Sequence, residues 1–391
     1  MPIKRVVIDR ANRVYQLPPD VLASVITDGR PSLIRRSQAI DLASFKWPAA
    51  FKKEKLPDAD TLAPADSNLL GSLRQDLAEW YLKRHKVRLN PDTELFIGGG
   101  ITHLVNLLTL CYVDNGDVAF VPNLGVPLYR AAVTSCGGEP IGYTISSKND
   151  WVPQFDRVGT RLGMVARLLF INSPHNPTGV DLGEKDFTEL VGLASRENIL
   201  LVNDFAYASI PSRSPVSLLS VTGGKKVGVE IGNLSYLLGL PPIPLGYVAG
   251  HRDVINGLKQ LPGRGQSFLP SYLVELARAG IRHFPSAQLR SMREYLQSAE
   301  NSASQLTKAL ELEKCGRAGI PFVWARIESR GSSNSLARAL YRRHRLLVVP
   351  GLSFGENGEG FLRLSLTAGA EAFEAAARRI ERGRMKKDSK E

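Results

Sequence analysis

The segment RLLFINSPHNPTG, Arg167–Gly179, places an apolar run of strand length directly before a turn that contains proline, asparagine and glycine. The segment ENILLVNDFAYASI, Glu197–Ile210, has the same order of apolar and polar residues. Helical patterns separate such runs along the middle of the chain. Apolar runs that alternate with helices are typical of parallel strands covered on both faces, so these two segments predict an α/β domain.

The same pattern extends outward in both directions. Further runs of strand length are TELFIGG (Thr93–Gly99), GDVAFVP (Gly116–Pro122) and KVGVEIGN (Lys226–Asn233). Ligands of open α/β sheets bind outside the carboxyl ends of the strands. The residues at these ends are therefore the first candidates for a site, namely Gly98, Gly99, Gly100, Asn176 and Asp204.

The pattern changes after Leu269, where a long helical stretch leads to the strand-like segments PFVWARI (Pro321–Ile327), LLVVPG (Leu346–Gly351) and GFLRLSL (Gly360–Leu366). Helical patterns separate these segments and also end the chain. We therefore expect a second, smaller α+β domain. The predicted division assigns residues 42–282 to the large domain, and residues 1–41 with 283–391 to the small domain.

Composition excludes several classes of protein. The net charge is +12 and the pI about 9.6, but the basic residues are spread over predicted helix faces without interleaved aromatic residues. We interpret the charge as solvated surface rather than as a nucleic-acid site. The cysteines and histidines have no metal-ligand spacing, so no metal site is expected. No apolar stretch is long enough for a membrane helix and no signal peptide is visible, which favours the cytoplasm.

The segments INSPHNPTG and VNDFAYASI, in this order, resemble the class I/II aminotransferases, which are pyridoxal-phosphate (PLP) enzymes of fold type I. The resemblance covers nearly the whole chain, because residues 71–100 and 348–366 also follow the family's order and spacing. The LL-diaminopimelate aminotransferases are the most similar branch. The resemblance implies a large, mainly parallel-sheet α/β/α domain plus a smaller α+β domain, PLP as cofactor, and a homodimer or a heterodimer with an active relative.

Several family residues are matched position by position. The resemblance assigns Asn176 and Tyr207 to the oxygen of the PLP ring, Asp204 to its pyridine nitrogen, and Arg363 to the substrate carboxylate. The positions that the resemblance places at the phosphate are Gly100, Thr102 and Ser235. Structural interpretations remain open for these residues, because Asn176 could fix its turn, Tyr207 could pack in the core and Arg363 could form an interdomain ion pair.

Other positions depart from the family, and the departures cluster on the cofactor. Tyr236 stands where the family has the lysine that forms the Schiff base, and Pro244 stands at an arginine that holds the phosphate. Val126 replaces the aromatic residue that stacks on the ring, and Pro64 lies near the tyrosine that a partner subunit contributes. A phenol has no amine, so Tyr236 cannot form the Schiff base, and it is a weak base at neutral pH without help.

The neighbouring lysines do not remedy this loss. Lys225 and Lys226 precede their predicted strand and therefore lie at its wrong end, where we expect solvated surface.

Two hypotheses for function follow. The first is a degenerate family member that does not transaminate and that binds a small anionic or amino-acid ligand. The alternative is an active enzyme that holds PLP or the pyridoxamine form non-covalently, with Tyr236 or His103 as the proton-transfer group. A role in nucleic-acid binding, driven by the positive charge, is a third and weaker hypothesis.

Overall fold

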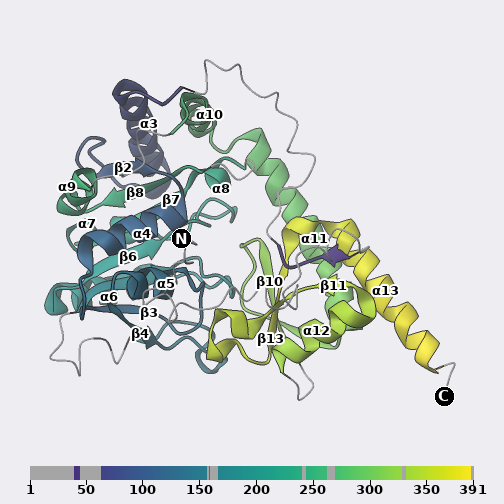
Figure 1. The fold of residues 1–391 in the computed structure, drawn as a ribbon. Coiled ribbons are helices and arrows are strands. Elements are labelled where there is room, and N and C mark those ends of the chain that lie inside the picture. The colour runs from purple at the N-terminus through teal and green to yellow at the C-terminus, as the bar shows by residue number, and fades with distance from the viewer. Residues whose placement is uncertain are drawn as a thin grey trace, which may run out of the picture.

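The computed structural model describes residues 39–44, 63–155, 158, 166–239, 244–261, 269–327 and 332–388. A larger unit built around a central sheet lies beside a smaller one, and the long helix α11 (Ala287–Ala309) runs between them (Figure 1). Most of the N-terminal segment that was predicted to join the small domain, residues 1–38, lies outside the described residues.

The larger unit contains a seven-stranded sheet in the order β2-β8-β7-β6-β5-β3-β4 within the described residues. Its strands are β2 (Leu95–Gly98), β3 (Val118–Pro122), β4 (Glu139–Tyr143), β5 (Ala166–Asn172), β6 (Leu200–Asp204), β7 (Gly228–Asn233) and β8 (Gly246–Gly250). All neighbours pair in parallel except β8, which is antiparallel to both β7 and β2. The predicted, mainly parallel sheet is confirmed.

Helices cover both faces of this sheet. They are α3 (Ser67–His85), α4 (Ile101–Tyr112), α5 (Leu128–Ser135), α6 (Glu184–Glu197), α7 (Gly224–Val227), α8 (Leu234–Leu238), α9 (Arg252–Gln260) and α10 (Ser271–Arg282). In β6, Leu201 and Val202 are adjacent in sequence but belong to different hydrophobic clusters. Since successive strand residues point to opposite faces, both faces must be apolar, which explains the continuous apolar runs.

The smaller unit is built on a four-stranded antiparallel sheet in the order β12-β13-β10-β9. Its strands are β9 (Leu312–Cys315), β10 (Phe322–Ile327), β12 (Val349–Pro350) and β13 (Phe361–Ser365). Its helices are α11, α12 (Ser333–His344) and α13 (Ala370–Asp388). The strand β1 (Ile40–Asp41) pairs in parallel with β11 (Leu346–Leu347), so this part of the N-terminal segment contacts the C-terminal part of the chain. The predicted domain boundaries themselves stay a prediction.

Short 3-10 helices complete the described elements: η4 (Ser147–Asn149), η5 (Leu218–Ser220), η7 (Gly351–Phe354), η8 (Glu356–Gly358) and η9 (Leu366–Ala368).

None of the helices in the described part of the chain is long and apolar enough to span a membrane.

A carboxylate is buried within the large sheet. Glu230, in the middle of β7, is fully buried. It accepts hydrogen bonds from Tyr81 Oη (3.0 Å), Asn203 Nδ2 (3.2 Å), Ser217 Oγ (2.9 Å) and the Leu218 amide (2.7 Å). Burial raises the pKa of Glu230 to about 7. The hydrogen bonds oppose this rise, and the one from Ser217 opposes it most. The protonated carboxyl is therefore the favoured form in the folded chain at mildly acidic pH.

We expect Glu230→Gln to become relatively more stable as the pH rises. The pKa of Glu230 in the folded state lies above its usual value of 4.5. Protonation of Glu230 therefore contributes its full stabilisation of the fold below pH 4.5, and this contribution is lost as the pH rises through about 7. Glutamine does not titrate. The free energy of unfolding of the wild type, relative to Glu230→Gln, should fall by roughly 2–3 kcal/mol between about pH 5 and pH 8 in urea denaturation. Parallel pH profiles for the two proteins would contradict this assignment.

Candidate functional site

The predicted residue Asp204 lies at the carboxyl end of β6 and is buried. Its Oδ2 accepts a hydrogen bond from Tyr129 Oη at 2.6 Å, and its Oδ1 accepts one from the amide of Ala206 at 3.1 Å. Burial raises the pKa of Asp204 to about 6, and the hydrogen bond from Tyr129 opposes this rise. Tyr129, on α5, was not predicted as a site residue. A tyrosine inside a helical pattern gives no sign that its hydroxyl reaches a carboxylate on another strand.

A second residue missed by the sequence, Asn172, fixes the turn that carries Asn176. Asn172 is the last residue of β5 and lies beside Asp204 in the parallel register. Its side-chain nitrogen donates to the carbonyl oxygen of Asp204 at 2.9 Å, and its side-chain oxygen accepts from the amide of Asn176 at 2.8 Å. The ends of β5 and β6 are therefore joined by one side chain, which holds Asn176 close to the residues after β6.

Asn176 is the centre of a polar contact between the two domains. Its Nδ2 donates to Tyr207 Oη at 3.0 Å. Its Oδ1 accepts from Arg363 Nη1, on β13 of the small domain, at 3.3 Å. All three side chains are buried. The fold thus brings together residues predicted from three separate segments, while the roles given to them by resemblance stay predictions.

Arg363 is a buried cation without a carboxylate partner among the described ion pairs, so the structure gives no support to the alternative of an interdomain ion pair. Its guanidinium carbon lies 4.1 Å from the ring centre of Phe322 and 4.9 Å from that of Phe354. Its Nη2 donates to the carbonyl of Ala43 at 3.4 Å, whereas Nε has no partner in the described part of the chain. Burial lowers the pKa of Arg363 to about 10, so the side chain stays charged at neutral pH.

Tyr236 packs directly on Tyr207. It lies on α8, whose first turn is capped by Asn233, since the side-chain oxygen of Asn233 accepts from the amides of Ser235 at 2.8 Å and Tyr236 at 3.3 Å. The rings of Tyr207 and Tyr236 are stacked, with centres 5.3 Å apart and an angle of 22° between them. Burial raises the pKa of Tyr236 well above its usual value, so it is a neutral phenol at physiological pH.

The predicted phosphate position at the start of α4 is partly occupied by the chain itself. Gly100, the N-cap residue, has a φ of 92°, which favours glycine. His103 Nδ1 accepts from the amide of Gly99 at 3.0 Å, and burial lowers the pKa of His103, which keeps the ring neutral and able to accept. Thr102 is exposed, and the backbone of Pro244 lies beside Gly100.

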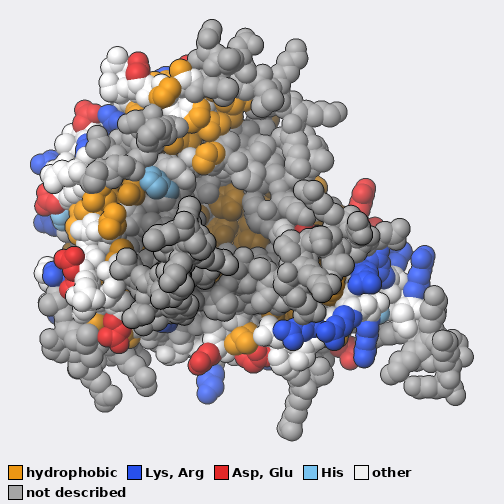
Figure 2. Space-filling model, viewed as in Figure 1, with side chains coloured by type: hydrophobic (Ala, Val, Ile, Leu, Met, Phe, Trp, Pro, Cys, Tyr) orange, Lys and Arg blue, Asp and Glu red, His pale blue; other side chains and the backbone are white. Residues whose placement is uncertain are grey.

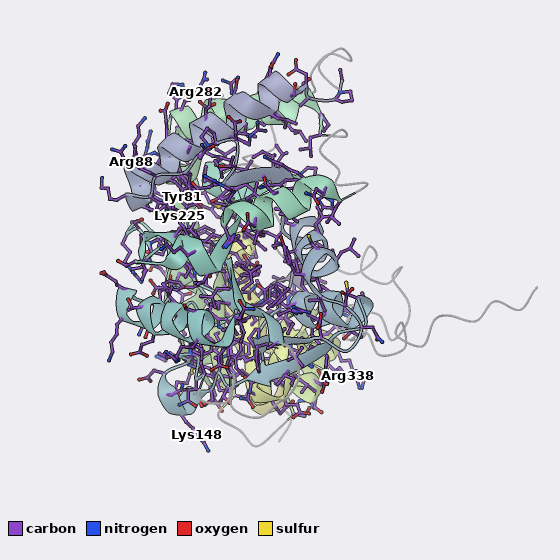
Figure 3. All side chains as sticks on the ribbon, turned by 90° about the vertical axis from the view of Figure 1, so that its left-hand side faces the viewer. Tyr81, Arg88, Lys148, Lys225, Arg282 and Arg338 are labelled. Atoms are coloured by element: carbon purple, nitrogen blue, oxygen red, sulfur yellow. The ribbon has the colours of Figure 1, made fainter. Side chains whose placement is uncertain are left out.

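The remaining positions that the sequence singled out are surrounded by other parts of the chain or lie at its surface. Val126 packs against two hydrophobic clusters, Pro64 is exposed and bridges Pro270, and Ser235 is buried. Lys225 lies beside Arg88 (Figure 3) and contacts Glu94 at 2.9 Å, at the start of β7 and away from Tyr236 at its end.

Lys226 lies on the same short helix, α7, before β7. Within the described residues, no group of histidine, cysteine and acidic residues could hold a metal ion.

Comparisons with known proteins identify the relatives of this chain. A family model described as aminotransferase class I and II matches residues 46–380. The LL-diaminopimelate aminotransferase of Halothermothrix orenii is 27% identical over 97% of this chain and 100% of its own length. That of Dehalococcoides mccartyi is 30% identical over 77% of this chain and 78% of its own.

Among solved structures, substrate-bound BacF from Bacillus subtilis has a TM-score of 0.83 at 23% identity, covering 96% of this chain and 98% of its own. An aminotransferase from Staphylococcus aureus has a TM-score of 0.77 at 21% identity, covering 96% of this chain and 99% of its own. At these identities, the solved structures show that the fold is shared.

We expect the stacked rings of Tyr207 and Tyr236 to stabilise the fold as a pair. Tyr207→Leu, Tyr236→Leu and the double variant form a thermodynamic cycle, read by urea denaturation. The coupling free energy should be about 0.5–1.5 kcal/mol, because a stacked aromatic pair contributes about this much beyond the burial of each ring. A coupling of about zero would show that the two rings do not depend on one another.

Proposed function

The chain belongs to the class I and II aminotransferase family, and we propose that it is a degenerate member that does not transaminate and that binds a small carboxylate-bearing ligand. The observation that carries this proposal is Tyr236. It stands at the position of the family's lysine, and its ring is stacked on that of Tyr207, one of the residues that would face the cofactor.

Family members use PLP, so the residues present must be tested against that cofactor. The residue types that would contact the polar atoms of the PLP ring are present, because Asp204, Asn176 and Tyr207 lie close together and buried. The residues that would contact the rest of the cofactor do not fit it. Tyr236 offers no amine for a covalent bond, Val126 offers no aromatic ring to stack, and Pro244 offers no cation to a phosphate. We conclude that the site does not fit a covalently held PLP.

Two further contacts oppose the cofactor. The Tyr129 hydroxyl already bonds Asp204 Oδ2, where the family's carboxylate would meet the pyridine nitrogen. The His103 ring already accepts the amide hydrogen of Gly99, at the helix start where a phosphate would bind.

The contacts that these replacements remove indicate how much affinity for PLP is lost. A charged hydrogen bond to phosphate is worth roughly 1.5–3 kcal/mol and an aromatic stack about 0.5–1.5 kcal/mol. Losing both weakens binding roughly 30-fold to more than 1,000-fold, before the missing covalent bond is counted.

Arg363 supports a carboxylate as part of the ligand. A buried cation is costly unless a negative group or hydrogen-bond acceptors compensate it. Here its Nε lacks a partner among the described residues, and its recorded hydrogen bonds go to the neutral oxygens of Asn176 and Ala43. A ligand carboxylate would supply both charge and acceptors, and the planar guanidinium suits it geometrically. Asn176 and Tyr207 lie close enough to contact the rest of such a ligand.

A second candidate function is an active enzyme that holds PLP or the pyridoxamine form non-covalently. The retention of Asp204 with Asn176 and Tyr207 favours this function. The two groups that would have to transfer the proton argue against it. The raised pKa of Tyr236 makes this phenol a poor base, and His103 Nδ1 is occupied by the amide of Gly99. We therefore rank this function second.

Assembly and location follow from the family. Aminotransferases of this family are typically homodimers, and we propose the same for this chain in the cytoplasm. Pairing with an active relative is the alternative. A degenerate subunit of that kind would act by stabilising or regulating its partner.

Tyr236→Lys alone should not create a transaminase. Val126 and Pro244 would still supply neither the stacking ring nor the phosphate contact. We expect its turnover with PLP, an amino acid and a 2-oxo acid to stay at least ~100-fold below that of the Dehalococcoides mccartyi relative assayed alongside. Wild type and Tyr236→Phe serve as blanks. Turnover of Tyr236→Lys close to the relative's would show that the other replacements matter little.

Arg363→Gln should weaken carboxylate binding. A panel of amino acids, 2-oxo acids and dicarboxylates is screened by thermal shift, and the best ligand is titrated by calorimetry. We expect at least ~10-fold weaker binding for Arg363→Gln, because the charged hydrogen bonds are lost. Arg326→Gln, an exposed arginine on neighbouring β10, is the matched control and should bind normally. A panel in which nothing binds, or binding that survives Arg363→Gln, would refute the proposed ligand.

A further inference from the structure

A groove of about 1040 Å³ lies on the small domain between α12 and α13, and its lining includes none of the candidate site residues. Its walls come from the facing sides of these two helices, and the end of α11 contributes Ala309 and Leu310. Figure 2 shows Lys and Arg side chains gathered over this region, at the lower right of the molecule where Figure 1 places α12 and α13.

The ionisable side chains that line the groove are all basic: Arg343, His344, Arg378, Arg379 and Arg382. Arg378 contacts Glu374 at 3.6 Å, and Arg379 donates to the carbonyl of His344 at 3.1 Å. Arg343 and Arg382 are exposed and belong to no ion pair recorded among the described residues. Burial, and then the charges of Arg343 and Arg379, lower the pKa of His344. The groove therefore has a positive potential, to which Arg343 and Arg382 contribute without an ion-pair partner among the described residues.

The floor of the groove differs from its rim. It is formed by apolar and small residues, namely Leu310, Leu336, Ala339, Leu340, Ala375, Ile380 and Gly383. On α12 the lining positions recur at helical spacing, as Leu336, Leu340 and Arg343 show. Small residues such as Ala339 and Ala375 allow another helix to approach closely. An apolar floor between two arginine-bearing rims is the complement of a helix that is apolar on one face and acidic on its flanks.

We propose that this groove between α12 and α13 is a docking site for an acidic amphipathic helix of a partner protein. A nucleic-acid backbone would use the arginines of the rim but would leave the apolar floor unused. Charge complementarity together with the floor therefore favours the helix. The proposal rests on the small domain alone, so it stands or falls independently of the ligand of Arg363.

The test uses the full-length protein and a fluorescein-labelled helical peptide made of Leu, Ala and Glu, with its leucines on one face. A peptide of the same composition, scrambled so that it has no apolar face, measures charge alone, and a single-stranded oligonucleotide tests the rival class. We expect the amphipathic peptide to bind at least ~10-fold more tightly than the scrambled one in fluorescence anisotropy. Its affinity should fall as salt rises from about 50 to about 300 mM.

Variants then locate the binding surface. Arg343→Glu combined with Arg382→Glu should weaken the amphipathic peptide at least ~10-fold. Ala339→Trp should weaken it as well, because the indole fills the floor without changing the charge. The matched control is Arg338→Glu, since Arg338 is exposed on the same helix outside the groove lining and lies at the outer edge of the molecule (Figure 3). It should change affinity less than ~3-fold.

Three results would overturn the proposal. The first is equal binding of the amphipathic and scrambled peptides, because the floor would then play no part. The second is tighter binding of the oligonucleotide with the same response to the paired arginine changes, which would assign the surface to nucleic acid. The third is equal loss for Arg338→Glu and for the groove variants, which would reduce the effect to net charge.

Discussion

The parallel register of β5, β6 and β7 is the constraint on which the candidate site depends. It places Asn172 beside Asp204 and Asp204 beside Ile231, so these three strands end at one edge of the sheet. The chain leaves each strand there, and the next few residues supply Asn176, Tyr207 and Tyr236. A slip of one residue in this register would turn the Asp204 carboxylate toward the opposite face of the sheet.

Hydrogen bonding at this edge explains how the buried polar groups of the candidate site are satisfied within the chain. Buried polar groups require partners, and in cofactor enzymes the cofactor supplies many of them. Here the chain supplies them itself, since Asn176 donates to Tyr207, Tyr129 donates to Asp204, and His103 accepts from Gly99. Arg363 is the exception, because it is buried and its Nε has no partner in the described residues. The candidate site thus combines polar groups that bond one another with a buried cation, Arg363, that has no carboxylate partner among the described ion pairs.

The sequence predicted the fold well because the signals for it are local. Apolar runs and strand-end residues indicated the parallel sheet, and the resemblance indicated that Asn176, Asp204 and Tyr207 would converge. Contacts that depend on tertiary structure could not be predicted. Tyr129 and Asn172 look like an ordinary helix residue and strand residue, and Glu230 is one charge in an apolar strand. The basic residues of α12 and α13 are distant in sequence, so no local pattern shows that they share a groove.

The central claim is that this family member holds no PLP on a lysine, and an absorbance titration tests it most directly. The purified protein is scanned from about 300 to 500 nm with added PLP, reduced with borohydride, and then weighed by mass spectrometry, because a lysine Schiff base absorbs in this range and reduction fixes it to the chain. We predict no saturable Schiff-base band and no PLP mass on a site peptide after reduction. A band that saturates with PLP, together with a single modified lysine, would show that another lysine has replaced the missing one and would contradict the account.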